Sequence, residues 1–71
     1  MVVKSQIILY MYDKLINGEK IVMDEILALF GISVRTFRRY ISEINSFLYN
    51  SYKNQQVVYD NTNHYYKITS R

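Results

Sequence analysis

The segment from Ser33 to Tyr49 constrains the fold more than any other part of the chain. Placed at 100° per residue, its apolar side chains fall within about an 80° arc, and polar and basic side chains gather opposite them. A helix with two such faces must pack its apolar side on other elements. The segment therefore predicts a helix over about 34–49 with a basic outer face. The apolar residues are Val34, Phe37, Ile41, Ile44 and Leu48, and the opposite residues are Arg35, Arg38, Arg39, Ser42 and Ser46.

Two residues mark where this helix begins. Gly31 breaks the preceding pattern, and Ser33 can cap the helix by accepting a hydrogen bond from an amide of the first turn. The segment before Gly31 predicts a short helix over about 23–30. Asp24 and Glu25 lie in its first turn, where acidic side chains favour the helix dipole. The sequence thus predicts two helices joined by a tight glycine turn.

A further helix is predicted over about 4–16. Its apolar residues recur at helical spacing and form one stripe. Asn17 and Gly18 follow directly and are a typical helix stop. The stripe consists of Ile7, Ile8, Met11 and Leu15.

A β-hairpin, or wing, is predicted over about 57–69, after a polar joint that extends to Gln56. Residues 57–59 and 65–69 are rich in β-forming side chains, and a turn-forming cluster lies between them. The tyrosines fall into two groups with different expected positions. The hairpin tyrosines should alternate between its two faces; they are Tyr59, Tyr65 and Tyr66. The other group should lie at the edge of the core, with the ring buried and the hydroxyl exposed to water; it consists of Tyr40, Tyr49 and Tyr52.

Length and composition place these elements in one mainly α-helical domain. A chain of 71 residues supports only one small core, and an apolar fraction of 49% is enough to fold it. There is no cysteine, which excludes disulfides and thiolate metal sites and favours a reducing compartment. No apolar run approaches the roughly 20 residues of a membrane helix, and no export signal opens the chain. We therefore expect a cytoplasmic protein.

Charge is distributed unevenly along the chain. Residues 1–32 carry three lysines and four acidic residues, whereas residues 33–71 carry six basic and two acidic residues. The positive charge therefore belongs to the half that contains the arginine-bearing helix. Such polarity is expected of a surface that contacts a polyanion, although on residue chemistry alone it is equally compatible with a solvated face.

The sequence contains no recognisable catalytic or metal-binding constellation. The lone histidine, His64, lies in a turn without a cysteine or a second histidine, so we expect no metal site. The acidic residues of the first half are scattered over separate helical faces and do not converge for acid–base chemistry. No glycine-rich phosphate loop is present. We expect a protein without a cofactor that is not an enzyme.

The order of helix, helix, helix and hairpin, with a glycine turn before a basic third helix, suggests a winged helix-turn-helix. The stretch ILALFGISVRTFRRYISEIN, residues 26–45, resembles the N-terminal DNA-binding domain of DeoR-type and WYL-domain bacterial regulators. That family follows roughly L-x-x-x-[LF]-G-[VI]-S-x-R-T-[IF]-x-R-D-[IL]-x-x-L. Segments 17–20, 58–60 and 66–68 are also similar to the family, so the resemblance covers nearly the whole chain. This chain departs from the family at Tyr40 in place of aspartate, at Leu27 in place of a small residue, and at Val22 or Met23 in place of a hydroxyl cap.

The resemblance implies sequence-specific binding of double-stranded DNA in transcriptional control. The third helix would enter the major groove, where an arginine can bridge two acceptors of a guanine, and the wing would contact the backbone. Arg35, Thr36 and Arg39 are then candidates for base edges, with Ser33, Arg38 and Ser42 beside them. Asn61, Thr62, Asn63, His64 and Lys67 are the candidates on the wing.

Two questions about partners stay open at the level of sequence. A single domain offers only about 600–1,000 Å² of DNA contact, so we expect a homodimer formed through the first helix or the wing. The alternative function is a winged-helix module that grips an effector protein, such as an inhibitor or a replication adaptor, because fold does not decide function. We expect either a free-standing small protein or a fragment of a larger regulator.

Overall fold

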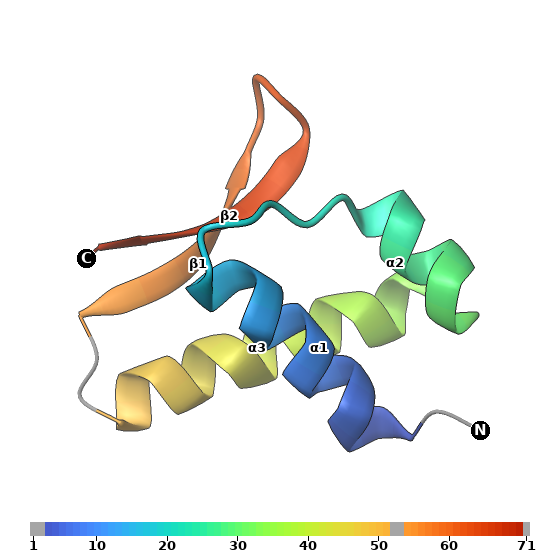
Figure 1. Cartoon of the computed structure of the whole chain (residues 1–71), viewed down its shortest axis with the longest axis horizontal. Helices are drawn as coiled ribbons and strands as arrows, with labels where there is room; N and C mark the ends of the chain where they lie inside the picture. Colours follow the sequence, from blue (N-terminus) through green and yellow to red (C-terminus); the bar gives the residue numbers. More distant parts are fainter. Residues whose placement is uncertain (1–2, 52–53, 71) are drawn as a thin grey trace.

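Three helices precede one hairpin in the computed structural model, which describes residues 3–51 and 54–70. The elements are α1 (Lys4–Ile16), α2 (Met23–Phe30), α3 (Val34–Asn50), β1 (Gln55–Asp60) and β2 (Tyr65–Ser70), shown in Figure 1. The predicted order is confirmed, and the boundaries agree to within two residues. The difference lies at β1, which begins at Gln55 instead of Val57 because Gln55 and Gln56 pair with Ser70 and Thr69 of β2.

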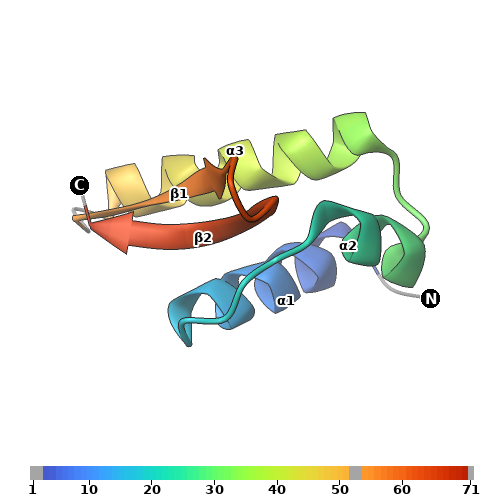
Figure 2. The same ribbon diagram turned by 90° about the horizontal axis from the view of Figure 1, so that it is seen from above.

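The core forms where the apolar stripe of α3 meets α1, α2 and the hairpin. Figure 2 shows α1 and α3 as two layers, with the hairpin alongside the C-terminal half of α3 and α2 near its beginning. Phe37 is fully buried at 0% exposure, which confirms its predicted place in the core. The buried residues are Ile7, Met11, Leu15, Ile21, Ile26, Phe37, Tyr40, Ile41, Ile44, Leu48 and Val57.

Two residues expected at the core of α3 or at its edge are exposed. Val34 is 38% exposed because the hairpin covers that side of α3 near Asn45 and leaves the first turn open. Tyr49 is 67% exposed because it follows Leu48 by 100° and so turns toward the arginine side. Tyr40 is buried, as its ring was predicted to be. Tyr52 lies outside the described residues.

The hairpin is fastened to the rest of the molecule by contacts that the sequence did not predict. Ile21, between α1 and α2, exchanges two backbone hydrogen bonds with Tyr66 at 2.9 and 2.7 Å, adding a one-residue bridge to the outer edge of β2. On the other edge, the Asn45 side chain accepts from Val57 N at 2.7 Å and donates to Val57 O at 3.3 Å. Both edges of the two-stranded sheet are thus held.

Aromatic packing continues from the hairpin into the core. Tyr59 and Tyr66 are cross-strand partners with ring centroids 4.9 Å apart, and Tyr66 lies edge-on to Phe37 at 5.2 Å. Tyr65 projects from the other side of the strand, where the Lys20 ammonium lies 4.9 Å from its ring. The predicted alternation of the hairpin tyrosines is confirmed. Tyr59 and Tyr66 share the side of the hairpin where Phe37 of α3 packs, and Tyr65 lies on the opposite side.

The turn between α2 and α3 completes a helix-turn-helix. Gly31 adopts the left-handed conformation with φ of 65°, and its N–H donates to Leu27 O at 2.8 Å, which ends α2. Together with the hairpin, this is the layout of a winged helix-turn-helix, the fold class predicted from the sequence. None of the helices in the described part of the chain is long and apolar enough to cross a membrane.

Candidate nucleic-acid interface

The start of α3 is fixed by its capping serine. Ser33 has extended backbone angles, and its Oγ accepts a hydrogen bond from Thr36 N at 3.1 Å, as the sequence predicted. The same hydroxyl lies 3.0 Å from Thr36 Oγ1, to which it donates. Ser33 is itself exposed, so the capped first turn opens to solvent.

The arginines of α3 share the exposed side of the helix. Arg35, Arg38 and Arg39 are all exposed, and Ser42 is exposed beside them. The ion pairs found within residues 3–51 and 54–70 join Lys4 to Glu43 and Lys67 to Asp60, so none involves these arginines. The three guanidinium groups therefore face solvent without an acidic partner in the described chain. We call this surface the arginine face.

Thr36 is less suited to the arginine face than its neighbours. It lies about 100° from Arg35 around the helix, it is half-buried, and its hydroxyl accepts the hydrogen bond from Ser33. The structure therefore brings Arg35 and Arg39 together but turns Thr36 toward the side of the helix. In this conformation Thr36 supports the cap.

The tip of the wing is built around one carboxylate. Asp60 Oδ1 accepts from the backbone N–H of Thr62 at 2.9 Å and of Asn63 at 3.0 Å, and its Oδ2 accepts from the Asn63 side chain at 3.1 Å. Lys67 Nζ lies 3.6 Å from Oδ2. The Asn63 amide and the Lys67 ammonium thus have partners inside the wing, whereas Asn61 and Thr62 present exposed side chains.

These contacts shift the acidity of Asp60. The Asn63 backbone N–H lowers the pKa most, followed by the Asn63 side chain, and together with the Thr62 N–H and the charge of Lys67 they bring it from 3.8 to about 2 despite partial burial, which raises it. Asp60 is therefore ionised throughout the neutral range. Its negative charge offsets that of Lys67, which is the only lysine or arginine of residues 55–70.

His64 holds an unusual position at the end of this turn. Its backbone is left-handed with φ of 60°, a region that residues other than glycine enter infrequently, and its N–H donates to Asp60 O at 2.8 Å. Its Nδ1 lies 3.2 Å from the Tyr59 hydroxyl. When that hydroxyl donates to Nδ1, the neutral ring keeps its proton on Nε2, where it can donate outward.

An open hollow of about 370 Å³ forms where α2, α3 and the wing meet. Arg38 lines it from α3, His64 from the wing tip and Asp24 from the first turn of α2. The fold therefore brings together two predicted site residues that are 26 positions apart in the sequence, Arg38 and His64. The remaining lining residues are Val22, Met23, Tyr59 and Tyr66.

Sequence reasoning missed the residues that position the wing. Asn45 lies mid-helix between apolar Ile44 and the exposed Ser46, and a lone amide at the edge of an apolar stripe was the available signal. Ile21 follows two charged residues and begins the short apolar run of residues 21–23, in which nothing marks it as a partner of the hairpin. Neither residue belongs to the arginine face: Asn45 holds the wing on α3, and Ile21 holds it on the segment between α1 and α2.

Within residues 3–51 and 54–70, no three histidine, aspartate or glutamate side chains cluster closely enough to hold a metal ion. Comparisons of the whole chain with protein-family models, with curated proteins and with solved structures found no match. The resemblance to DeoR-type and WYL-domain regulators is therefore supported by the quoted residues alone.

Proposed function

We propose that this protein is a cytoplasmic, sequence-specific double-stranded DNA-binding module that acts in transcriptional control. The observation that carries the proposal is the arginine face, in which Arg35, Arg38 and Arg39 are exposed on one capped helix without an acidic partner in the described chain. The three like charges repel one another, and a polyanion bound across them would relieve that repulsion. The α3 helix also forms one outer layer of the molecule (Figure 2), and a helix has a width that the major groove admits.

The shape around the arginine face favours the binding of a DNA duplex over the binding of a flat acidic protein surface. The wing stands beside α3, and the hollow lined by Arg38 and His64 separates the helix from the wing tip. A duplex seated on α3 would place a backbone strand along this hollow, with Arg35 and Arg39 toward base edges. Asn61 and the His64 ring can then contact phosphate or sugar, which positions the protein without reading sequence.

The test is DNA binding by the whole chain, measured by fluorescence anisotropy after selection of bound sites from a random duplex pool. Affinity should fall steeply with salt, with a slope of about 0.9 per phosphate contact on a double logarithmic scale. A flat salt response, or no selected sequence, would contradict the proposal and favour the protein-binding alternative.

Two double variants separate the arginine face from net charge. Each removes two positive charges, one pair from the arginine face and the other from the first half of the chain. Loss of the arginines should weaken binding by at least about tenfold and remove sequence preference, whereas loss of the lysines should lower affinity only through the weaker long-range field. Equal effects of the two variants would refute the assigned face. The pairs are Arg35→Ala with Arg39→Ala against Lys14→Ala with Lys20→Ala.

A further inference from the structure

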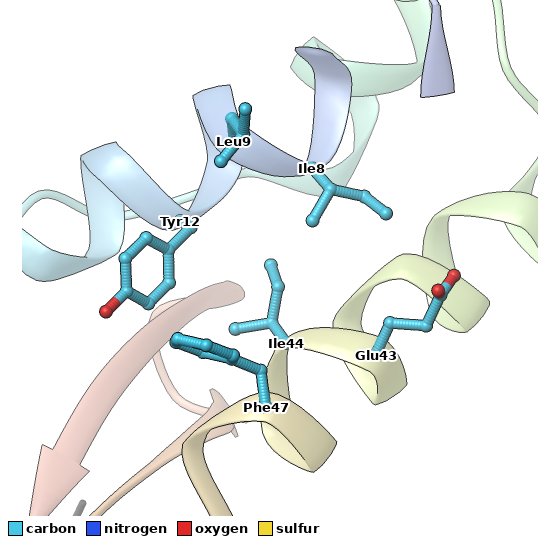
Figure 3. A pocket seen from close by; sticks show the side chains of 6 residues that line it. All are labelled: Ile8, Leu9, Tyr12, Glu43, Ile44 and Phe47. Carbon is cyan, nitrogen blue, oxygen red and sulfur yellow. The ribbon is translucent and has the colours of Figure 1, made fainter. Parts of the chain in front are cut away.

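A second surface of the molecule has the opposite chemistry to the arginine face. A hollow of about 280 Å³ opens between α1 and α3. Figure 3 shows Ile8 and Tyr12 of α1 facing Ile44 and Phe47 of α3, with Leu9 at the rim. The Tyr12 and Phe47 rings meet edge-on at 5.6 Å and form one end of the hollow.

Charge is almost absent from this hollow. Of the residues that line it, only Glu43 is charged, and it lies at the end opposite Phe47 (Figure 3). Lys4 Nζ lies 3.2 Å from Glu43 Oε2 and neutralises it within the same molecule. A charged ligand would therefore lose its hydration here without gaining a counter-charge, so the surface favours an apolar occupant.

The exposed apolar area matches the requirement of a small protein interface. Leu9 is 62% exposed and Phe47 is 50% exposed, and Ile16, two turns along α1 from Leu9, is 42% exposed. Phe47 alone leaves roughly 100 Å² of apolar surface, because an aromatic side chain carries about 150–250 Å². Leu9 and the half-buried Ile8 and Tyr12 extend this surface across the hollow, and Ile16 extends it beyond the hollow along α1. An interface at the small end of the stable range, about 600 Å² per partner, is a little over half apolar and needs an apolar centre of this kind.

We propose that a second copy of this chain covers the hollow, forming a two-fold dimer in which Leu9 of each copy inserts beside Phe47 and Tyr12 of the other. The patch is self-complementary because the projecting Leu9 and the recess lie next to one another, as a two-fold contact requires. The chain has a net charge of +3, so copies repel one another over most faces and approach at least cost where the local charge is neutralised.

This arrangement leaves both surfaces usable at once. The hollow lies on the side of α3 that faces α1, whereas Arg35, Arg38 and Arg39 project from a side that solvent covers. A dimer through the hollow would carry two arginine faces in one particle. The dimer itself does not depend on DNA, so it can be tested on the protein alone.

The experiment is sedimentation velocity of the whole chain from micromolar to near-millimolar concentration, without DNA. The wild-type protein should pass from monomer to dimer as concentration rises. Leu9→Lys and Phe47→Lys should each weaken the dimer by at least about tenfold, because a buried ammonium opposes the contact. The matched control is Leu29→Lys on α2, since Leu29 is 60% exposed and lies outside the hollow.

Three results would overturn the proposal. They are a wild-type chain that stays monomeric over the whole range, a Leu9→Lys dimer as strong as the wild type, and an equal loss in Leu29→Lys. Circular dichroism of each variant shows whether it folds, and Leu9 tolerates lysine in the monomer because its side chain is already in water. If Phe47→Lys were to unfold, Leu9→Lys alone would decide the matter. Dimerisation without DNA binding would refute the proposed function and leave the dimer intact.

Discussion

At the scale of single residues, the partners of each basic group decide what it can still bind. Arg35 and Arg39 are exposed and take part in neither ion pair of the described chain, whereas Lys67 lies 3.6 Å from the Asp60 carboxylate. Binding a phosphate would cost Lys67 part of that interaction. The sequence predicted base contacts for Arg35 and Arg39 and a backbone contact for Lys67, and the structure adds that Lys67 has an acidic partner within the wing.

Arg35→Ala should lower affinity for the selected site by about 1–3 kcal/mol and flatten the preference at one base pair. Arg35→Lys should keep most of the non-specific affinity but lose the preference, because an ammonium cannot bridge two acceptors of a guanine. Competition with single-base site variants measures both effects. Lys67→Ala is the comparison, and it should weaken all sequences alike. An unchanged base preference in Arg35→Ala would show that Arg35 does not recognise a base pair.

Asp60 gives the wing turn a defined response to acid. Its folded pKa of about 2 lies below the ordinary 3.8, so its stabilising contribution is complete above pH 3.8 and disappears as pH falls through about 2. The NMR shifts of the Thr62 and Asn63 amides should therefore titrate with a midpoint near 2. Asp60→Asn should remove this titration. A midpoint near 3.8 in the wild-type protein would show that the turn contacts are not maintained in solution.

At the scale of elements, the position of the wing depends on one side chain of α3. Asn45 bonds both backbone polar groups of the buried Val57, and so replaces the neighbouring strand that β1 lacks on that edge. The aromatic contact between Tyr66 and Phe37 fixes the other strand over the same helix. The hollow between Arg38 and the wing tip keeps its width through these contacts.

Asn45→Ala should lower the free energy of unfolding by about 1–3 kcal/mol, because it leaves the Val57 N–H and C=O without partners in a largely buried position. The matched control is Asn50→Ala on the same helix, where an exposed amide bonds Ser46 Oγ at 3.5 Å and the change should stay within about 0.5 kcal/mol. Urea unfolding monitored by circular dichroism measures both. Equal stability of the two variants would show that the Asn45 hydrogen bonds to Val57 do not stabilise the fold.

At the scale of the whole molecule, charge and apolarity occupy different faces. The arginine face lies on the solvent side of α3, and the apolar hollow lies between α3 and α1. In the two proposals made above, a body of 32 × 28 × 21 Å binds a polyanion through one surface and a second copy of itself through the other. The two surfaces share α3, so the orientation of the arginines in a dimer follows from how the hollows meet.

Most of the fold could be predicted from local patterns. The apolar periods of α1 and α3, the glycine turn and the turn cluster of the wing each specify an element through its own residues. The arginine face followed from the same periodicity, since residues opposite a core stripe must face water. Val34 and Tyr49 could not be placed in this way, because spacing gives a direction around a helix but does not say which neighbours cover it.

The sequence by itself determined the bounds of the three helices to within one residue, the place of the hairpin turn and the side of α3 that carries positive charge, because capping, turn chemistry and helical periodicity act within a few residues. The tertiary structure alone decided that His64 meets Arg38 across a hollow, that Asp60 neutralises Lys67, and that Asn45 and Ile21 hold the edges of the wing. Those contacts join residues of different elements or of the segments between elements. Their existence depends on how the elements pack, which no local pattern encodes.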